Sequence, residues 1–250
     1  MDPEQFRRSL LSLFEQYTDL AYKPGKGAVT SIRTTDLNIP PLVLRELEIA
    51  LYQSVREHPQ AALALCDLLW QDPHTEMKII AARMLGQLPS EFIDDVLQRI
   101  ENWTAEQRDP FFEKVFLENG TASIRRNEPD KLMQRAKEWC ENKAHNKKKT
   151  GLQALIILAD DQNYINLPAI FNALELLFLD TPAALQSDII DLMTILLKRS
   201  PVETAFFIRQ MLERSATKTV VRISRKMLPL LPPESQPAIA ALLRTIPVNK

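Results

Sequence analysis

Apolar side chains recur along this chain at the three- and four-residue spacing of amphipathic helices. The clearest stretches are residues 41–55 and residues 185–197. Because residues three and four apart share one side of a helix, each stretch presents an apolar stripe to a core. Strand-like alternation of apolar and polar residues is nearly absent. The pattern therefore predicts an all-α protein.

Prolines indicate where the expected helices begin. A proline at the first helical position already has the required φ and lacks only an N–H that would have no partner there. Pairs such as His58-Pro59, Asp72-Pro73 and Ser200-Pro201 fit this position, and Ser200 with Glu203 forms the S-x-x-E pattern of a capping box. We expect helices near residues 3–21, 41–57, 59–71, 74–88, 90–102, 110–119, 128–141, 147–160, 167–179, 182–199, 201–214, 217–230 and 233–245.

The helix entrances also show a loose internal repeat. Alternate entrance prolines are 31 to 39 residues apart in two runs, Pro41, Pro73 and Pro110, then Pro129, Pro168, Pro201 and Pro232. This step is typical of degenerate HEAT-like pairs, in which two-helix repeats stack into an α-solenoid. We expect about six pairs in one continuous array over residues 40–250. Residues 1–39 are expected to form an N-terminal helix and a polar loop.

Composition excludes several classes of protein. The 250 residues include only 5 glycines, and no glycine-rich phosphate loop, HExxH or GxSxG motif is present. The two cysteines, Cys66 and Cys140, are too few for a disulfide framework. Cys66 falls on an apolar helical stripe and is expected to be buried, whereas the place of Cys140, near a helix end, is left open. No apolar run approaches the ~18 residues of a membrane span. We expect a cytoplasmic, monomeric protein without a cofactor or a metal.

Charge is unevenly distributed, although the net charge is only −1. Residues 121–149 carry nine Lys and Arg against four acids, and residues 198–226 carry eight against two. Lys147, Lys148 and Lys149 stand at the start of an expected helix, where they oppose the positive end of the helix dipole. An anion near that helix end would explain them, as free backbone N–H groups and ammonium groups would act together on a phosphate. A solubilising loop is the alternative.

Further candidate contacts lie on later helices and on the tryptophans. Arg222, Arg225 and Lys226 share one side of the next-to-last long helix, and Arg199 ends an earlier one. Trp103 and Trp139 lie at helix ends, where packing is the favoured role and contact with DNA the alternative. For Asp109, ahead of Pro110, a helix N-cap is the favoured role and catalysis the alternative.

Three segments share an order of helices with one known family. They are HPQAALALCDLLWQDPHTEMKIIAARMLGQLP at 58–89, NWTAEQRDPFFEKVFLENG at 102–120 and EWCENKAHNKKKTGLQALIIL at 138–158. In this order, and over most of residues 40–226, the chain resembles the HEAT-like-repeat DNA alkylation-repair proteins. That bacterial family includes glycosylases that release N3- and N7-alkylated purines from duplex DNA.

The resemblance implies binding more clearly than it implies catalysis. In active family members an aspartate four residues after a tryptophan stabilises the sugar cation as the base leaves, and a later helix adds a second tryptophan and an arginine. Here the position four after Trp103 holds Gln107, and Asp109 lies two residues further on. A neutral amide cannot stabilise a developing cation as a carboxylate does. Residues 183–199 contain no tryptophan, whereas Lys149 falls close to the family's backbone-contacting base.

Three hypotheses follow from these observations. The favoured one is a protein that binds duplex DNA through a basic concave surface, with Trp139 and the cations on the phosphates: Lys147, Lys148, Lys149, Arg199, Arg222, Arg225 and Lys226. The second is an active alkylpurine DNA glycosylase that uses Trp103 together with Asp109 or another acid near that tryptophan. The third is a protein-protein interaction scaffold with no DNA role. An acidic protein segment would suit the basic patches as well as DNA does.

Overall fold

A computed structural model describes residues 2–18, 37–106, 110–179 and 182–246 of the chain. Within these residues all regular structure is helical, with fourteen α-helices and three short 3-10 helices. The prediction of an all-α, solenoid-like protein is confirmed. Contacts within the chain fall into two compact units, Met1–Glu128 and Pro129–Lys250. That residues 40–250 form a single continuous array stays a prediction, and most of the expected polar loop lies outside the described residues.

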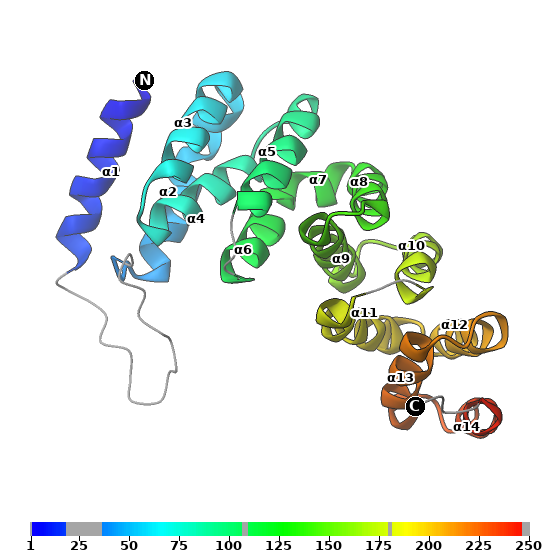
Figure 1. The fold of residues 1–250 in the computed structure, drawn as a ribbon. Helices are drawn as coiled ribbons and strands as arrows, with labels where there is room; N and C mark the ends of the chain where they lie inside the picture. Colours follow the sequence, from blue (N-terminus) through cyan, green and yellow to red (C-terminus); the bar gives the residue numbers. More distant parts are fainter. Residues whose placement is uncertain (1, 19–36, 107–109, 180–181, 247–250) are drawn as a thin grey trace. The chain divides into compact units, whose positions relative to one another are not determined.

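The described residues of unit 1 form seven α-helices, drawn from blue to green in Figure 1. Within it, α3 packs against α1, α2 and α4, while α4 packs against α2 and α6. Helices α2, α4 and α6 are thus successive neighbours and form one layer of the unit. The bounds are α1 (Pro3–Thr18), α2 (Pro41–Glu57), α3 (Pro59–Gln71), α4 (Thr75–Leu85), α5 (Ile93–Glu106), α6 (Pro110–Gly120) and α7 (Ala122–Asn127).

In unit 2 the part of the chain that the structure describes forms seven further α-helices, arranged in two layers. Helices α8, α10, α12 and α14 are successive neighbours in one layer, and α9, α11 and α13 are successive neighbours in the other. The repeated pairing agrees with the two-helix repeat inferred from the prolines. The bounds are α8 (Pro129–Glu141), α9 (His145–Asp160), α10 (Leu167–Leu179), α11 (Gln186–Arg199), α12 (Pro201–Arg214), α13 (Lys218–Met227) and α14 (Gln236–Thr245).

Most predicted helix bounds agree with the structure, and the differences have local causes. Helices 41–57, 59–71, 167–179 and 201–214 begin and end as predicted. The short helix α7 was missed because its six residues are too few to show a periodic stripe. The capping box at Ser200 is wrong: no side-chain bond caps α12, and the Ser200 hydroxyl instead donates to Glu203 Oε2 at 2.6 Å.

A second predicted helix entrance, at Asp72, also differs from the structure. The sequence places Asp72 at the start of a helix, but α4 begins only at Thr75. Asp72 is instead the C-cap residue that follows the last residue of α3. Its buried carboxylate accepts bonds from Arg7 Nε at 2.7 Å and from the backbone N–H of His74 at 3.0 Å. The His74 ring nitrogen Nδ1 lies 2.7 Å from Asp72 Oδ1, the same oxygen that accepts from the His74 N–H, while Arg7 binds Oδ2. Because Arg7 belongs to α1, this cluster connects α1 to the segment between α3 and α4.

The Asp72 cluster makes unit 1 sensitive to acid. Burial by itself would raise the pKa of Asp72, but the bonds from His74 and Arg7 outweigh it and hold the pKa below its usual value. Since the unfolded pKa is about 3.9, the carboxylate stabilises the fold above that pH and loses this effect as pH falls through the lower folded pKa.

Replacement of Asp72 by asparagine is expected to lower the free energy of unfolding by ~1–2 kcal/mol at neutral pH, because hydrogen bonds to a charged group are lost. The loss should shrink in acid. Urea unfolding at neutral and acidic pH measures both values, with Glu46→Gln, an exposed carboxylate on α2, as the control. An equal loss at both pH values would contradict the assigned role of the Asp72 charge.

Aromatic rings form the centre of unit 1. The rings of Trp70 and Trp103 stack at a centroid distance of 4.7 Å with 10° between their planes. Phe116 meets Trp70 edge-on at 4.3 Å and Trp103 at 5.9 Å. The three rings therefore join α3, α5 and α6.

Helices α8 and α9 are in close contact at Gly151. A Cβ atom at this position would lie 2.7 Å from Ala136 O and 2.8 Å from both Cys140 N and Cys140 Sγ. Only a residue without a side chain fits this gap, because such distances are far inside van der Waals contact. Gly151 therefore sets the spacing of this helix pair.

Both cysteines are buried, Cys66 as the sequence predicted and Cys140 where the sequence left the question open. Cys66 is 0% exposed and Cys140 is 2% exposed. Burial raises the pKa of the Cys66 thiol, and it raises the pKa of Cys140 to about 12. Neither thiol is therefore a nucleophile in the folded protein. No helix among the described residues is long and apolar enough to cross a membrane.

Candidate functional site

The three predicted lysines lie in the first turns of α9. Lys147, Lys148 and Lys149 are each partly buried, in a helix that begins without a side-chain cap at Ala144 and has no acid in its first turn. Their charges and the positive end of the helix dipole therefore act in the same place, as the sequence predicted. The arrangement is suited to an anion.

One carboxylate stands close to these lysines. Asp188 lies in the first turn of α11, which packs against α9. Burial raises its pKa and the nearby charge of Asp191 adds to the effect, while Lys149 and His145 pull it down. The structure thus brings Lys149 and His145 together with an acid that the sequence analysis did not connect with them.

The second predicted cluster lies on α13. Arg222, Arg225 and Lys226 are all exposed, while Val220, Ile223 and Met227 on the same helix are buried. The three cations therefore share the solvent side of α13, as the spacing predicted. Helix α13 is in the same layer of unit 2 as α9 and α11.

Arg199 is engaged in a different way from the other predicted cations. Its guanidinium donates to Ala159 O at 2.8 Å, Asp161 O at 3.0 Å and Tyr164 O at 2.8 Å. These carbonyls lie at and just beyond the end of α9, where a helix leaves acceptors unsatisfied. Arg199 thus has a structural task, and contact with DNA stays a prediction.

The predicted tryptophans are interior residues. Trp139 on α8 is 3% exposed and Trp103 is 5% exposed in the ring stack of unit 1. Packing, the role favoured from the sequence, accounts for both. Their part in DNA contact or catalysis stays a prediction, and Asp109 lies outside the described residues. No three His, Cys, Asp or Glu side chains gather into a metal-binding group within the part of the chain described here.

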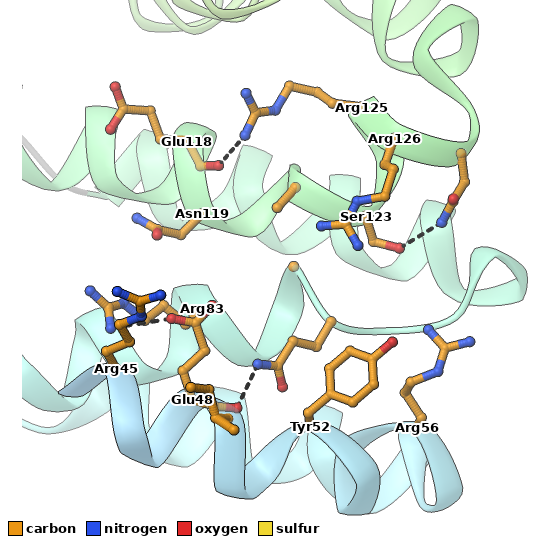
Figure 2. Close-up of a pocket in the computed structure, with 15 residues that line it drawn as sticks. Arg45, Glu48, Tyr52, Arg56, Arg83, Glu118, Asn119, Ser123, Arg125 and Arg126 are labelled. Carbon is orange, nitrogen blue, oxygen red and sulfur yellow. Dashed lines mark hydrogen bonds and ion pairs between the residues drawn. The ribbon is translucent and has the colours of Figure 1, made fainter. Parts of the chain in front are cut away.

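A cluster of arginines that the sequence analysis missed lines a pocket in unit 1. The pocket has a volume of about 530 Å³ and lies between α2, the end of α4, and α6 with α7 (Figure 2). We name it the arginine pocket. Its polar and aromatic lining comprises Arg45, Glu48, Tyr52, Arg56, Arg83, Gln87, Glu118, Asn119, Ser123, Arg125, Arg126 and Asn127.

The arginine pocket is strongly cationic. Its five arginines face only two acids, Glu48 and Glu118, which leaves a formal excess of three positive charges. Arg83 Nη1 pairs with Glu48 Oε2 at 3.3 Å, and Arg125 Nη2 donates to the backbone oxygen of Glu118 at 2.7 Å. Several guanidinium groups that line one concave site are suited to a phosphate.

The sequence offered only a partial signal for this pocket. Arg45, Tyr52 and Arg56 are seven and four residues apart, so they share one side of the expected helix 41–57. Arg125 and Arg126 fall in the basic stretch 121–149, but Arg45, Arg56 and Arg83 are single arginines far from it in the chain and form no local run of charge. Only the packing of α4 between α2 and α6 brings them together.

The chain matches one family model. A model described as "DNA alkylation repair enzyme" matches residues 38–228, which is most of the chain. The protein belongs to this family, as the resemblance in the sequence indicated. No curated protein and no solved structure matches the chain.

Proposed function

We propose that this protein binds duplex DNA through the phosphate backbone, using basic surfaces on the α9, α11 and α13 layer of unit 2. The observation that carries the proposal is the lysine cluster at the uncapped start of α9. Cations at that end of a helix oppose the dipole, and a bound phosphate would remove the conflict. Membership of a DNA-repair family makes DNA the natural source of that phosphate.

The α13 cluster adds to this surface. Arg222, Arg225 and Lys226 are exposed and lie in the layer that contains the lysines. Contacts of this kind fix a protein on a duplex without reading its sequence. The proposal therefore predicts strong salt dependence and little sequence preference.

Release of an alkylated base is not part of the proposal. Gln107 occupies the position where the resemblance places the catalytic aspartate. The ring of Trp103 is covered by Trp70 and Phe116, so it presents no open surface to a base in this structure. The proposed role is recognition of DNA.

The test is binding of a fluorescent duplex over a series of salt concentrations. Changing Lys147, Lys148 and Lys149 together to glutamine is expected to flatten the slope of log affinity against log salt by up to ~3 units, because up to three phosphate contacts are lost. Fluorescence anisotropy measures the slope.

The matched control removes three cations from the other layer of unit 2. Lys131, Arg135 and Lys137 on α8 are changed to glutamine, and the slope should remain within ~1 unit of the natural protein. Equal effects of the two triple variants would contradict the assignment to α9. Failure of the natural protein to bind at low salt would reject DNA and favour an acidic protein segment as the ligand.

A further inference from the structure

The arginine pocket contains features that a plain phosphate site does not need. Tyr52 projects from α2 into the space below Ser123 and Arg126 (Figure 2). Its side chain is 46% exposed, although large aromatic rings are usually covered. Arg56 Cζ lies 5.6 Å from the ring centroid, so a guanidinium already rests against the ring. An aromatic ring beside arginines provides a stacking platform.

The back wall of the pocket has hydrogen-bonding capacity that the protein does not use. Arg83 Nε is buried and donates no hydrogen bond, and Nη1 makes an ion pair with Glu48 but no hydrogen bond. Gln87 donates through Nε2 to Glu48 O at 2.8 Å, but Gln87 Oε1 is buried without a donor. Buried polar atoms are rarely left unpaired, and each such atom favours a ligand or a water molecule nearby.

The form of the pocket also fits a small organic anion. Its volume of about 530 Å³ lies within the ~300–1,000 Å³ that is usual for small-ligand sites. Asn119, Asn127 and Ser123 add donors and acceptors on the wall formed by α6 and α7. A phosphate would account for the arginines, and an attached base would account for Tyr52 and the amides.

We infer that the arginine pocket binds a nucleotide whose base is unpaired, with the phosphate held by guanidinium groups and the base stacked on Tyr52. Within a duplex each base is paired and stacked between its neighbours, so the unpaired base that Tyr52 stacks on must have left the helix or belong to a single strand. The inference rests on the proposed function for one point, namely that the ligand is a nucleic acid. It adds a site in unit 1 with a different preference from the lysines of unit 2.

The first test compares a short single strand with a blunt duplex of the same sequence. Changing Tyr52 to leucine should weaken binding of the single strand by roughly five- to a hundredfold, the contribution of one base on an aromatic ring, and leave the duplex unchanged. Tyr17→Leu, a partly exposed tyrosine on α1, is the matched control and should change neither affinity. A Tyr52→Leu variant that binds the single strand as the natural protein does would overturn the inference.

A second comparison tests the phosphate half of the site. Arg126→Gln should weaken the single strand and reduce the salt slope by ~1 unit, whereas Arg8→Gln, an exposed arginine on α1, should leave both unchanged. Equal effects of the two changes would remove Arg126 from the site. Circular dichroism of each variant verifies the fold, and the substituted side chains are exposed.

Competition identifies the source of the nucleotide. Deoxyadenosine monophosphate should displace the labelled strand at concentrations where inorganic phosphate does not. Equal displacement by inorganic phosphate would overturn the stacking of a base on Tyr52. Binding of the mononucleotide without any binding of a strand would retain the nucleotide and assign the pocket to its free form.

The two proposals fail in different ways. If the lysine triple variant loses duplex binding while Tyr52→Leu has no effect on either probe, the proposed function stands and the inference falls. If the natural protein binds the single strand through Tyr52 but does not bind the duplex, the inference stands and the duplex proposal falls.

Discussion

Replacement of Trp70 by alanine is expected to lower the free energy of unfolding of unit 1 by ~3–5 kcal/mol, the usual cost of removing a buried tryptophan. Trp70 is 7% exposed and stacks on Trp103, with the edge of Phe116 against it. Lys78 Nζ also lies 4.9 Å from the ring centroid. The change would open a cavity where three helices meet, and the surrounding rings cannot fill it without leaving their own contacts.

Urea unfolding measured by circular dichroism and tryptophan fluorescence gives this value. Trp103 then reports on unit 1 and Trp139 on unit 2, so the loss should appear mainly in the signal of Trp103. Leu42→Ala on α2 is the control, because that side chain is 66% exposed and its truncation should change stability by no more than ~0.5 kcal/mol. A loss below ~1 kcal/mol for Trp70→Ala would show that the ring stack does not hold unit 1 together.

Replacement of Gly151 by alanine is expected to destabilise unit 2 by ~2–3 kcal/mol, because the added methyl overfills the contact between α8 and α9. The atoms that it would meet at 2.7 and 2.8 Å include the backbone oxygen of Ala136 and the backbone nitrogen of Cys140. Backbone atoms of a helix cannot turn aside as a side chain can, so the two helices must separate. This cost exceeds the ~1 kcal/mol that alanine gains over glycine in helix propensity.

Gly120 provides the matched control for this substitution. A Cβ at Gly120 would meet Ile100 Cδ1 at 3.4 Å, the upper edge of tight contact, and no backbone atom nearer than 3.8 Å. Gly120→Ala should therefore be neutral or stabilise unit 1 by up to ~1 kcal/mol, because alanine lowers the conformational entropy of the unfolded chain. The measurement is the thermal unfolding of each variant beside that of the natural protein. If they are equally stable, the spacing of α8 and α9 does not depend on Gly151.

Local patterns were sufficient to predict most of the helices. Proline at the first helical position and the apolar spacing each depend on neighbouring residues, and the starts at Pro41, Pro59 and Pro201 were correct for that reason. Asp72 shows where such reasoning ends. Its carboxylate binds Arg7, which lies 65 positions away in the chain, and no local pattern reports a partner at that distance.

Of the two candidate sites, one could be predicted from neighbouring residues and the other could not. Lys147, Lys148 and Lys149 are adjacent in sequence, so their place at the start of α9 could be predicted. The arginine pocket combines side chains from four helices, and its existence depends on how α4 packs between α2 and α6. Burial decides the remaining cases. A sequence shows that Trp103 and Trp139 are present near helix ends, but only the packed structure shows that both rings point inward.

The distribution of cysteines has a practical consequence. Each compact unit carries one buried, uncharged thiol, Cys66 in unit 1 and Cys140 in unit 2. A thiol reagent attacks the thiolate, and the closed units offer it neither access nor charge. Alkylation of each cysteine therefore requires local unfolding of the unit that contains it. Timed alkylation followed by mass spectrometry of the two cysteine peptides would then time the opening of both units in one sample, without any added probe.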